Sequence, residues 1–392
     1  MNAPMRPTAR PVILTFVHHY LPGYRSGGPV RTISHMVAAL GDQFDFRIVT
    51  ADRDARDAEP YPGLPAAGTW VEVGGAQVLY LAPQERSLGS VARLLRQTPH
   101  DILYLNSFFD ADFTFKPLLA RRLGLAPRAR CTIAPRGEFS EGAQALGAWK
   151  KEPYIRGAQM LGLYRDLTWQ ASSAHEADDI RRVMGHRARD VRVAIDLPDL
   201  TPQAPTAWQP RRPGEPLRVC FLSRVTPKKN LAFAIDIVGK ARASIRLDIY
   251  GPIHDRAYWS RCEQQMAKLA PSVVTYRGSI EHAAVTSMLG RYDVLFLPTL
   301  GENYGHVILE ALSAGTPVLI SDTTPWRDLE PAGVGWELPL SKPEAFVAVI
   351  EQLAAMPADQ QLRMRECARR FAEERRRDTT AIDSNRRLFA AA

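Results

Sequence analysis

The sequence predicts an α/β protein made of two doubly wound domains, each with a mainly parallel sheet between layers of helices. Short apolar runs typical of buried strands alternate with segments of helical periodicity over most of the chain. Six prolines lie between residues 198 and 216 and divide this alternation into two series. The length of 392 residues suits about two to three domains.

The first series predicts a domain over residues 11–200. Residues 1–10 contain prolines and arginines without the apolar core of a signal peptide, so we expect a disordered lead-in there. Residues 51–70 are rich in proline and glycine and are expected to form a long loop. The expected strands occupy residues 11–17, 46–50, 101–105, 130–134 and 166–171.

The second series follows the proline-rich linker at 198–216 and predicts a domain over residues 217–374. Residues 359–392 are helical in composition, and the arginines at 375–377 are expected to mark a bend or a charged face. The expected strands of this domain occupy residues 217–222, 246–250, 273–276, 294–297 and 318–320.

Composition excludes several classes of protein. The 50 basic and 42 acidic residues give a net charge of +8 that is spread over both halves, which disfavours a nucleic-acid binder. The four cysteines are scattered without metal-ligand spacing, which favours reduced thiols in a cytoplasmic protein. No apolar run approaches the roughly 18 residues of a membrane-spanning helix. Glycine-rich dinucleotide and P-loop motifs are missing, which argues against a dehydrogenase and a P-loop enzyme.

Two glutamates, Glu302 and Glu310, flank a predicted junction between a loop and a helix that follows a strand. Helical periodicity begins near Val307, and Gly315 and Pro317 end it. If the whole span were helical, the two carboxylates would lie about 12 Å apart. Retaining glycoside hydrolases hold their two carboxylates about 5–5.5 Å apart. We therefore predict that the pair positions a ligand and does not act as nucleophile and acid.

Two cations, Arg224 and Lys229, lie on the predicted connection between a strand and the next helix. Arginine offers two parallel N–H groups to a diphosphate, and lysine adds a point charge. The carboxyl ends of strands in open α/β sheets are where such ligands bind. The sequence therefore predicts an anion site here, with Lys228 as a solvated neighbour.

These two segments resemble the Arg-x4-Lys and Glu-x7-Glu elements of retaining glycosyltransferases of family 4, the glycosyl transferases group 1 type. The resemblance covers residues 11 to about 390 and is strongest over 217–340. It implies two Rossmann-like domains that face each other across a cleft, the GT-B fold. It also implies that a C-terminal helix within 375–392 completes the first domain.

The resemblance implies transfer of a hexose from a nucleotide-diphosphate sugar to a saccharide or lipid-linked acceptor with anomeric retention, as in cell-surface polysaccharide or glycan synthesis. Arg224, Lys229 and Glu302 would be the catalytic residues, because negative charge develops on the departing diphosphate. Glu310 would bind the ribose hydroxyls. The donor sugar would contact Glu302 together with Asn303, Tyr304 and Gly305.

Further donor contacts are implied by two glycine-containing segments. Gly278 and Ile280 match a segment that meets the nucleotide base in the family. Gly27 and Gly28 match the glycine-rich first loop, where a ligand can approach the backbone closely. On the acceptor side, Arg136 and Glu138, with Ser140 nearby, match a loop of the first domain that faces the acceptor and the reacting sugar.

The first domain departs from the family pattern at a histidine. Many relatives carry one after a strand of this domain, whereas here the strand ending at Leu105 runs into Asn106. His18 and His19 follow the first strand instead, where a polar cap is the favoured interpretation. No general base is assigned, because in the family the leaving phosphate can take the acceptor proton.

Two Asp-x-Asp sequences, at 52–54 and 110–112, match the metal motif of the other glycosyltransferase fold. The resembled family is metal-independent, so we expect no metal and no cofactor beyond the donor itself. Helix capping by Asp110 or Asp112 is the favoured role. Ser173 and Glu176 are spaced as a helix capping box.

Three alternatives stay open. A nucleotide-sugar 2-epimerase of similar architecture would convert the donor without an acceptor. A non-catalytic nucleotide-sugar-binding subunit would bind the donor without turnover. Peripheral contact with the inner membrane face is an alternative to a solvated helix end for the arginines at positions 121, 122, 128 and 130.

Overall fold

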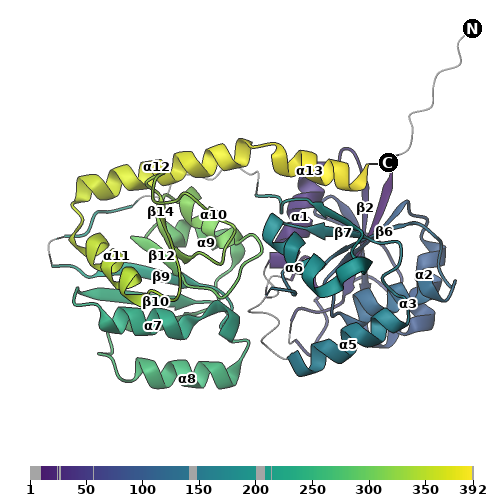
Figure 1. Cartoon of the computed structure of the whole chain (residues 1–392), viewed down its shortest axis with the longest axis horizontal. Helices are drawn as coiled ribbons and strands as arrows, with labels where there is room; N and C mark the ends of the chain where they lie inside the picture. Colours follow the sequence, from purple (N-terminus) through teal and green to yellow (C-terminus); the bar gives the residue numbers. More distant parts are fainter. Residues whose placement is uncertain are drawn as a thin grey trace, which may run out of the picture. The chain divides into compact units, whose positions relative to one another are not determined.

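The computed structural model describes residues 10–23, 25, 28–55, 57–140, 148–199, 208–212 and 214–390, with the backbone alone at 148–150. The chain divides into two compact units. Unit 1 comprises residues up to Leu197 together with Thr380 onward, and unit 2 runs from Pro198 to Thr379. Residues 1–9 of the predicted lead-in and residues 200–207 and 213 of the proline-rich linker fall outside the described residues. The division lies close to the predicted boundary, and each unit is described by itself (Figure 1).

Unit 1 is built on an eight-stranded sheet with the order β3-β4-β2-β1-β5-β6-β7-β8. Every pairing is parallel except the β3–β4 hairpin. Its strands are β1 (Val12–Val17), β2 (Asp45–Ala51), β3 (Val71–Val73), β4 (Ala76–Leu81), β5 (Ile102–Asn106), β6 (Arg130–Ala134), β7 (Thr168–Ala171) and β8 (Asp190–Val193). Its helices are α1 (Gly28–Leu40), α2 (Leu88–Gln97), α3 (Lys116–Arg122), α5 (Ala148–Met160), α6 (Ala174–Met184) and α13 (Thr380–Phe389), with short turns η1 (Pro83–Glu85), η2 (Ala111–Phe115) and η3 (Gly185–Arg187).

Alternation along β1 explains why helices cover both faces of this sheet. Ile13 and Val17 join a buried cluster with α1 and α13, while Leu14 and Phe16 join a cluster with α2, α3, α5 and α6. A strand buried on both faces reads as a continuous apolar run, as the sequence does here. The predicted two-sided α/β layering is confirmed for this unit.

The C-terminal helix α13 packs within unit 1. The Phe389 ring lies 5.9 Å from that of Phe44 and 5.2 Å from that of Tyr104, between centroids. The Asn385 side chain donates to the Ile195 carbonyl at 2.7 Å. The preceding helix, α12, ends at Arg377, so the arginine run marks the break between the two helices.

Unit 2 is built on a six-stranded sheet, all of it parallel, in the order β11-β10-β9-β12-β13-β14. In Figure 1, α7 and α8 lie on one side of this sheet and α9 and α10 on the other. Its strands are β9 (Leu217–Leu222), β10 (Ile245–Tyr250), β11 (Val274–Gly278), β12 (Val294–Leu297), β13 (Val318–Ser321) and β14 (Gly335–Leu338). Its helices are α7 (Leu231–Lys240), α8 (Arg256–Met266), α9 (His282–Leu289), α10 (His306–Ser313), α11 (Pro343–Ala355) and α12 (Ala358–Arg377), with a short turn η4 (Pro227–Lys229).

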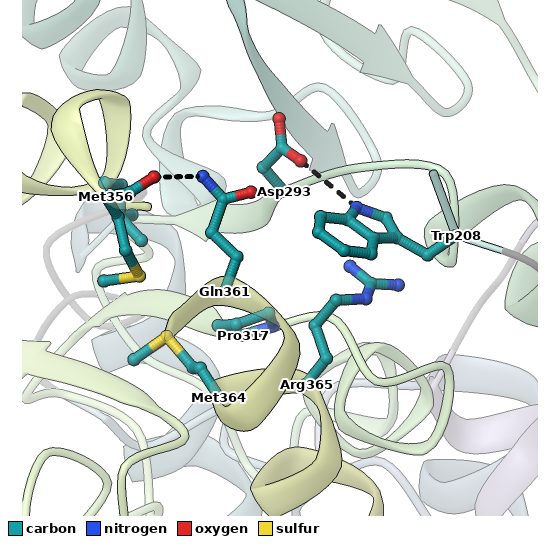
Figure 2. A pocket seen from close by; sticks show the side chains of 8 residues that line it. Trp208, Asp293, Pro317, Met356, Gln361, Met364 and Arg365 are labelled. Atoms are coloured by element: carbon teal, nitrogen blue, oxygen red, sulfur yellow. Dashed lines mark hydrogen bonds between the residues drawn. The ribbon is translucent and has the colours of Figure 1, made fainter. Parts of the chain in front are cut away.

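Near the amino ends of β9 and β12, a buried cation fastens α12 to the rest of unit 2 (Figure 2). The Arg365 guanidinium donates to the carbonyls of Tyr292 at 2.8 Å and Gly290 at 2.7 Å. Its Cζ lies 4.8 Å from the centre of the Trp208 ring, whose Nε1 donates to Asp293 at 3.3 Å. This cluster stabilises the fold and takes no part in the site below.

Each sheet has one point where the strand order reverses. In unit 1 this switch point lies between β1 and β5, and in unit 2 between β9 and β12. Helices on the two sides of a switch point diverge, which leaves a crevice at the carboxyl ends of the two strands where ligands bind in open α/β sheets. Functional residues are therefore expected at two places, the carboxyl ends of β1 and β5 in unit 1 and those of β9 and β12 in unit 2.

Candidate functional site at the switch point of unit 2

The loop after β9 carries Arg224 and is fixed by the neighbouring strand. Ser223 N–H donates to the Tyr250 carbonyl at 3.1 Å, and Val225 N–H to the Pro252 carbonyl at 2.9 Å. Gly251 packs against this loop with φ +127°, and a Cβ there would lie 2.0 Å from the Ser223 carbonyl oxygen. Only glycine fits such an approach, so β10 holds the backbone beside Arg224 closely.

The loop after β12 is tied to the loop after β9. The Lys228 carbonyl accepts from the Thr299 hydroxyl at 3.1 Å and from Leu300 N–H at 2.8 Å. The Thr299 carbonyl in turn accepts from the hydroxyls of Ser321 at 2.6 Å and Thr323 at 2.7 Å. The hydroxyls of Thr299, Ser321 and Thr323 set the path of the chain into the glutamate loop, and these residues were not predicted from the sequence.

Lys229 and Glu302 form an ion pair across the switch point. Their side chains are 12% and 17% exposed, so both are largely removed from water. Burial raises the pKa of Glu302, but Lys229, Lys228 and Arg224 more than offset this, and the pKa lies below the ordinary value. Burial lowers the pKa of Arg224, which Glu302 partly offsets. Three cations and a carboxylate are thus concentrated in one small region.

The remaining residues of the predicted motif continue from this loop into α10. Gly305 precedes the helix with φ +81°, and a Cβ there would approach Ile308 and Glu302 to 2.8 and 3.0 Å. The Tyr304 carbonyl accepts from the Trp326 indole N–H at 2.6 Å. This contact explains why the backbone after Glu302 follows a defined path.

Glu310 lies one turn into α10 with a side chain that is 12% exposed. Its Oε1 is 3.9 Å from Nδ1 of His282, the first residue of α9. His282 was not among the residues predicted from the sequence. The two predicted glutamates therefore differ in setting, since Glu302 pairs with a loop lysine and Glu310 lies beside a helix N-terminus.

Gly278 ends β11 and Ile280 follows it at the same carboxyl edge. The Gly278 carbonyl accepts from Gly251 N–H at 2.9 Å. Together with the bond from Ser223 to Tyr250, this links the carboxyl ends of the neighbouring strands β11, β10 and β9 by hydrogen bonds. Gly278 has φ +82° and would meet nothing within 4 Å if it carried a Cβ. The predicted donor residues of this unit thus share one edge of one sheet. What this arrangement offers chemically is a cationic site for a diphosphate with carboxylates beside it for hydroxyl groups.

The sequence-predicted residues of unit 1 are distributed differently. Gly27 lies outside the described residues, and Gly28 is the exposed first residue of α1. Arg136 is buried and pairs with Asp196 at 2.5 Å, and its Nη2 donates to the Tyr104 hydroxyl at 2.5 Å. Arg136 is therefore fixed by partners inside the unit, and acceptor contact by it stays a prediction.

Glu138 is also turned inward. Its carboxylate accepts from the Ser107 hydroxyl at 2.8 Å and from the backbone N–H groups of Phe108 at 2.5 Å and Phe109 at 3.3 Å. Burial raises the pKa of Glu138, and these hydrogen bonds partly offset that. Glu138 thus braces the loop after β5, and its predicted contact with an acceptor is untested.

The predicted capping box at α6 is confirmed for the serine cap and wrong for the role of the glutamate side chain. The Ser173 hydroxyl does accept from Glu176 N–H at 3.2 Å. The Glu176 carboxylate, however, accepts from Gly137 N–H at 2.6 Å and from Ser172 N–H at 2.8 Å. Glu176 points into the core because Gly137 supplies a long-range backbone donor, which local spacing cannot reveal.

The two Asp-x-Asp sequences have structural partners. Asp110 Oδ1 caps the turn η2 by accepting from Asp112 N–H at 2.9 Å and Phe113 N–H at 2.7 Å. Asp112 pairs with Lys116 at 2.5 Å, and Asp52 with Arg53 at 2.8 Å. Over the part of the chain that the structure describes, no group of three or more His, Cys, Asp or Glu side chains is arranged to hold a metal ion.

The two Rossmann-like α/β units match those of GT-B glycosyltransferases over almost the whole chain. Anabaena HepE, solved with UDP and glucose, matches with a TM-score of 0.69 at 16% identity, covering 97% of this chain and 98% of that chain. Sucrose-phosphate synthase from Thermosynechococcus elongatus matches with a TM-score of 0.70 at 16% identity, covering 98% and 100%. The predicted fold class is confirmed.

Residues 203–371, which lie within unit 2, match the family model of glycosyl transferases group 1. The phosphatidyl-myo-inositol mannosyltransferases of Mycobacterium tuberculosis (strain ATCC 25618 / H37Rv) and Mycobacterium bovis (strain ATCC BAA-935 / AF2122/97) are 30% identical over 201 residues. The match covers 49% of this chain and 52% of each relative, so the chain spans about half the length of these relatives.

Proposed function

We propose that this protein is a glycosyltransferase that moves a hexose from a nucleotide-diphosphate sugar to a saccharide or lipid-linked acceptor, with retention at the anomeric carbon. The observation that carries the proposal is the Lys229–Glu302 pair beside Arg224, at the switch point of a domain that matches glycosyl transferases group 1. Cations preorganised where the leaving diphosphate gains charge stabilise the transition state more than the ground state.

Each residue of the site has a role in this proposal. Arg224 binds the diphosphate through parallel N–H groups, and Lys229 supplies a charge that Glu302 holds in place. Glu310 accepts from the ribose hydroxyls, and Glu302 with the backbone at Asn303 to Gly305 contacts the donor sugar. Gly278 and Ile280 meet the base. Anabaena HepE was solved with UDP and glucose and also with UDP-glucose, which makes a uridine nucleotide the first donor to test.

The test is release of nucleoside diphosphate from a panel of nucleotide sugars, with and without free, aryl-linked and lipid-linked saccharides. We expect release that depends on both a donor and an acceptor, with the product retaining the donor's anomeric configuration by NMR. Conversion of the donor without an acceptor would support the 2-epimerase instead. Donor binding by thermal shift without any turnover would support a non-catalytic subunit.

We also propose peripheral contact with an anionic membrane, at the inner face of the cytoplasmic membrane, through two loops of unit 1. Leu123 and Leu125 follow α3, and Met160 and Leu161 end α5, with exposures of 57%, 37%, 88% and 51%. The Arg122 Nε donates to the Leu161 carbonyl at 3.0 Å, so the loops are neighbours. Exposed apolar side chains beside cations are the pattern of a surface that inserts shallowly among anionic headgroups.

A basic depression adjoins these loops and supports the same proposal. It has a volume of about 610 Å³, and it is lined in part by Gln159, the residue before Met160. Its lining includes three arginines and a histidine, which outnumber two aspartates: Arg165, His186, Arg187 and Arg189 against Asp166 and Asp190. Among the described helices, none is long and apolar enough to cross a membrane. The proposed contact is therefore through loops and charge.

Replacing Met160 and Leu161 together with aspartate is expected to weaken cosedimentation with phosphatidylglycerol vesicles at least about tenfold, since two apolar anchors are lost and two negative charges are added. Vesicles of phosphatidylcholine alone should bind the wild type weakly. Leu362→Asp is the control, because Leu362 is 46% exposed on α12 of unit 2. Equal binding of the wild type and the double variant would overturn the assignment.

A further inference from the structure

The switch point of unit 1 carries a polar pair of its own. His18 directly follows β1, and Asp110 follows β5, the parallel neighbour of β1, where Val17 stands opposite Asn106. His18 Nδ1 lies 2.6 Å from Asp110 Oδ2. From the sequence, His18 was expected to be a polar cap at a strand end and Asp110 a helix cap, with no contact between them predicted. Their pairing depends on the adjacency of β1 and β5, which the chain order does not show.

Both members of the pair are held in place. The His18 carbonyl accepts from the Thr50 hydroxyl at 3.1 Å and from Ala51 N–H at 2.9 Å. The His18 ring lies against the Phe113 ring, with 5.1 Å between centroids. Asp110 has a side chain that is only 9% exposed, and its Oδ1 is occupied by the backbone of η2. Capping therefore uses one carboxylate oxygen, and the other is directed at the imidazole.

This geometry fixes the tautomer of His18. Burial raises the pKa of Asp110, but His18 and the two backbone N–H groups more than offset this, so the pKa lies below the ordinary value and the group is a carboxylate. A carboxylate only accepts hydrogen bonds, so Nδ1 of His18 carries the hydrogen. Nε2 of the neutral ring is then the proton-accepting nitrogen, on a side chain that is 41% exposed.

The neighbouring histidine provides a contrast. His19 Nδ1 is 3.2 Å from the Arg53 carbonyl, and burial, followed by His18, lowers the pKa of His19. That ring is held by a backbone carbonyl, and the carboxylates of Asp54 and Asp110 only partly offset the lowering of its pKa. Of these two adjacent histidines, His18 has the support that a general base requires: a hydrogen-bonded orienting group and an exposed second nitrogen.

We propose that His18 is the proton acceptor for the acceptor hydroxyl, with Asp110 as its positioning residue. This rests on the proposed glycosyl transfer. In the step, the acceptor O–H bond breaks and its proton moves to Nε2, while the acceptor oxygen forms a bond to the anomeric carbon. The bond from that carbon to the diphosphate oxygen breaks, and its electron pair leaves with the diphosphate. Retention requires the acceptor oxygen to form its bond on the face of the sugar from which the diphosphate leaves.

Other charged or titratable groups surround the pair and enter any pH profile. They are His19 after β1, Asp54 after β2, Arg86 before α2, Asp112 in η2, Lys116 at the start of α3, Glu138 after β6 and Tyr154 on α5. A base that must be neutral predicts a transfer rate that rises with pH through one deprotonation. A variant that removes only that base separates its contribution from that of these neighbours.

His18→Asn is the sharpest variant, because its amide nitrogen can replace Nδ1 as donor to Asp110 while nothing replaces Nε2. With the acceptor and donor that give turnover in the wild type, we expect kcat to fall about 10²-fold or more, the acid limb of the pH profile to disappear, and donor binding by thermal shift to stay unchanged. His19→Asn is the matched control and should keep both the rate and the acid limb.

Asp110→Asn provides the second measurement. It retains the cap through one oxygen and presents an N–H group to His18, which favours the wrong tautomer, so we expect at least about tenfold loss of kcat with an unchanged melting temperature. Wild-type rates and pH profiles in both variants would overturn the proposed roles of His18 and Asp110. The departing phosphate would then be the proton acceptor. Absence of turnover in the wild type with every donor and acceptor would instead contradict the proposed glycosyl transfer itself.

Discussion

Lys229→Ala is expected to lower transfer by about 10³-fold while leaving unit 2 folded. Lys229 is a largely buried cation beside Arg224, and its removal leaves the Glu302 carboxylate without its ion-pair partner at the place where the diphosphate gains negative charge. Loss of one preorganised donor to a developing anion costs about 10²–10³-fold, and repulsion from Glu302 adds to this. Nucleoside diphosphate release under saturating donor measures the effect directly.

The control for this substitution lies on the adjacent helix. Lys240→Ala removes the same charge from the end of α7, where the side chain is 56% exposed and pairs with Asp236, so transfer should change by less than about twofold. Arg224→Lys should retain the charge but lose the parallel N–H pair, and we expect a loss between those of the two alanine variants. Wild-type turnover in Lys229→Ala would contradict the proposed role of the clamp, defined as Arg224, Lys229 and Glu302 together.

The site of unit 2 could be predicted because its chemistry is local in sequence. Arg224 and Lys229 lie on one strand-to-helix connection, and Glu302 and Glu310 on another. Buried parallel strands are short apolar runs, so the two connections were recognisable without knowing which strands pair. The pairing of Lys229 with Glu302 needed the additional fact that β9 and β12 are neighbours. The sequence predicted the members of the clamp, and the fold supplied the contact between them.

Unit 1 was less predictable for the same reason. Its key contacts join residues far apart in the chain, such as His18 with Asp110, and Glu176 with Gly137. Rules based on residue spacing identify only partners that are close in sequence, so Glu176 was expected to complete a capping box with Ser173. Residues 71–81 were also missed as strands, although Gly74 and Gly75, both with positive φ, are typical of the turn in the β3–β4 hairpin.

Arg365→Met is expected to lower the free energy of unfolding of unit 2 by about 3–5 kcal/mol, because it removes a buried cation that satisfies several backbone carbonyls. The Arg365 side chain is 2% exposed, and besides Tyr292 and Gly290 it reaches the Ala314 carbonyl at 3.4 Å. Methionine fills a similar length, so the loss comes mainly from unpaired carbonyls and from the contact with Trp208 (Figure 2).

Arg363→Met is a matched control on the same helix, since Arg363 is 64% exposed and pairs with Asp359 one turn away. Its substitution should change the free energy of unfolding by no more than about 0.5 kcal/mol. Urea denaturation followed by circular dichroism measures both variants. Equal midpoints for the two would show that the carbonyls of Gly290 and Tyr292 find other partners. A large loss in Arg365→Met alone would show that α12 is fastened to the sheet by this guanidinium, at the strand ends opposite the clamp, where stability can be changed without touching the chemistry.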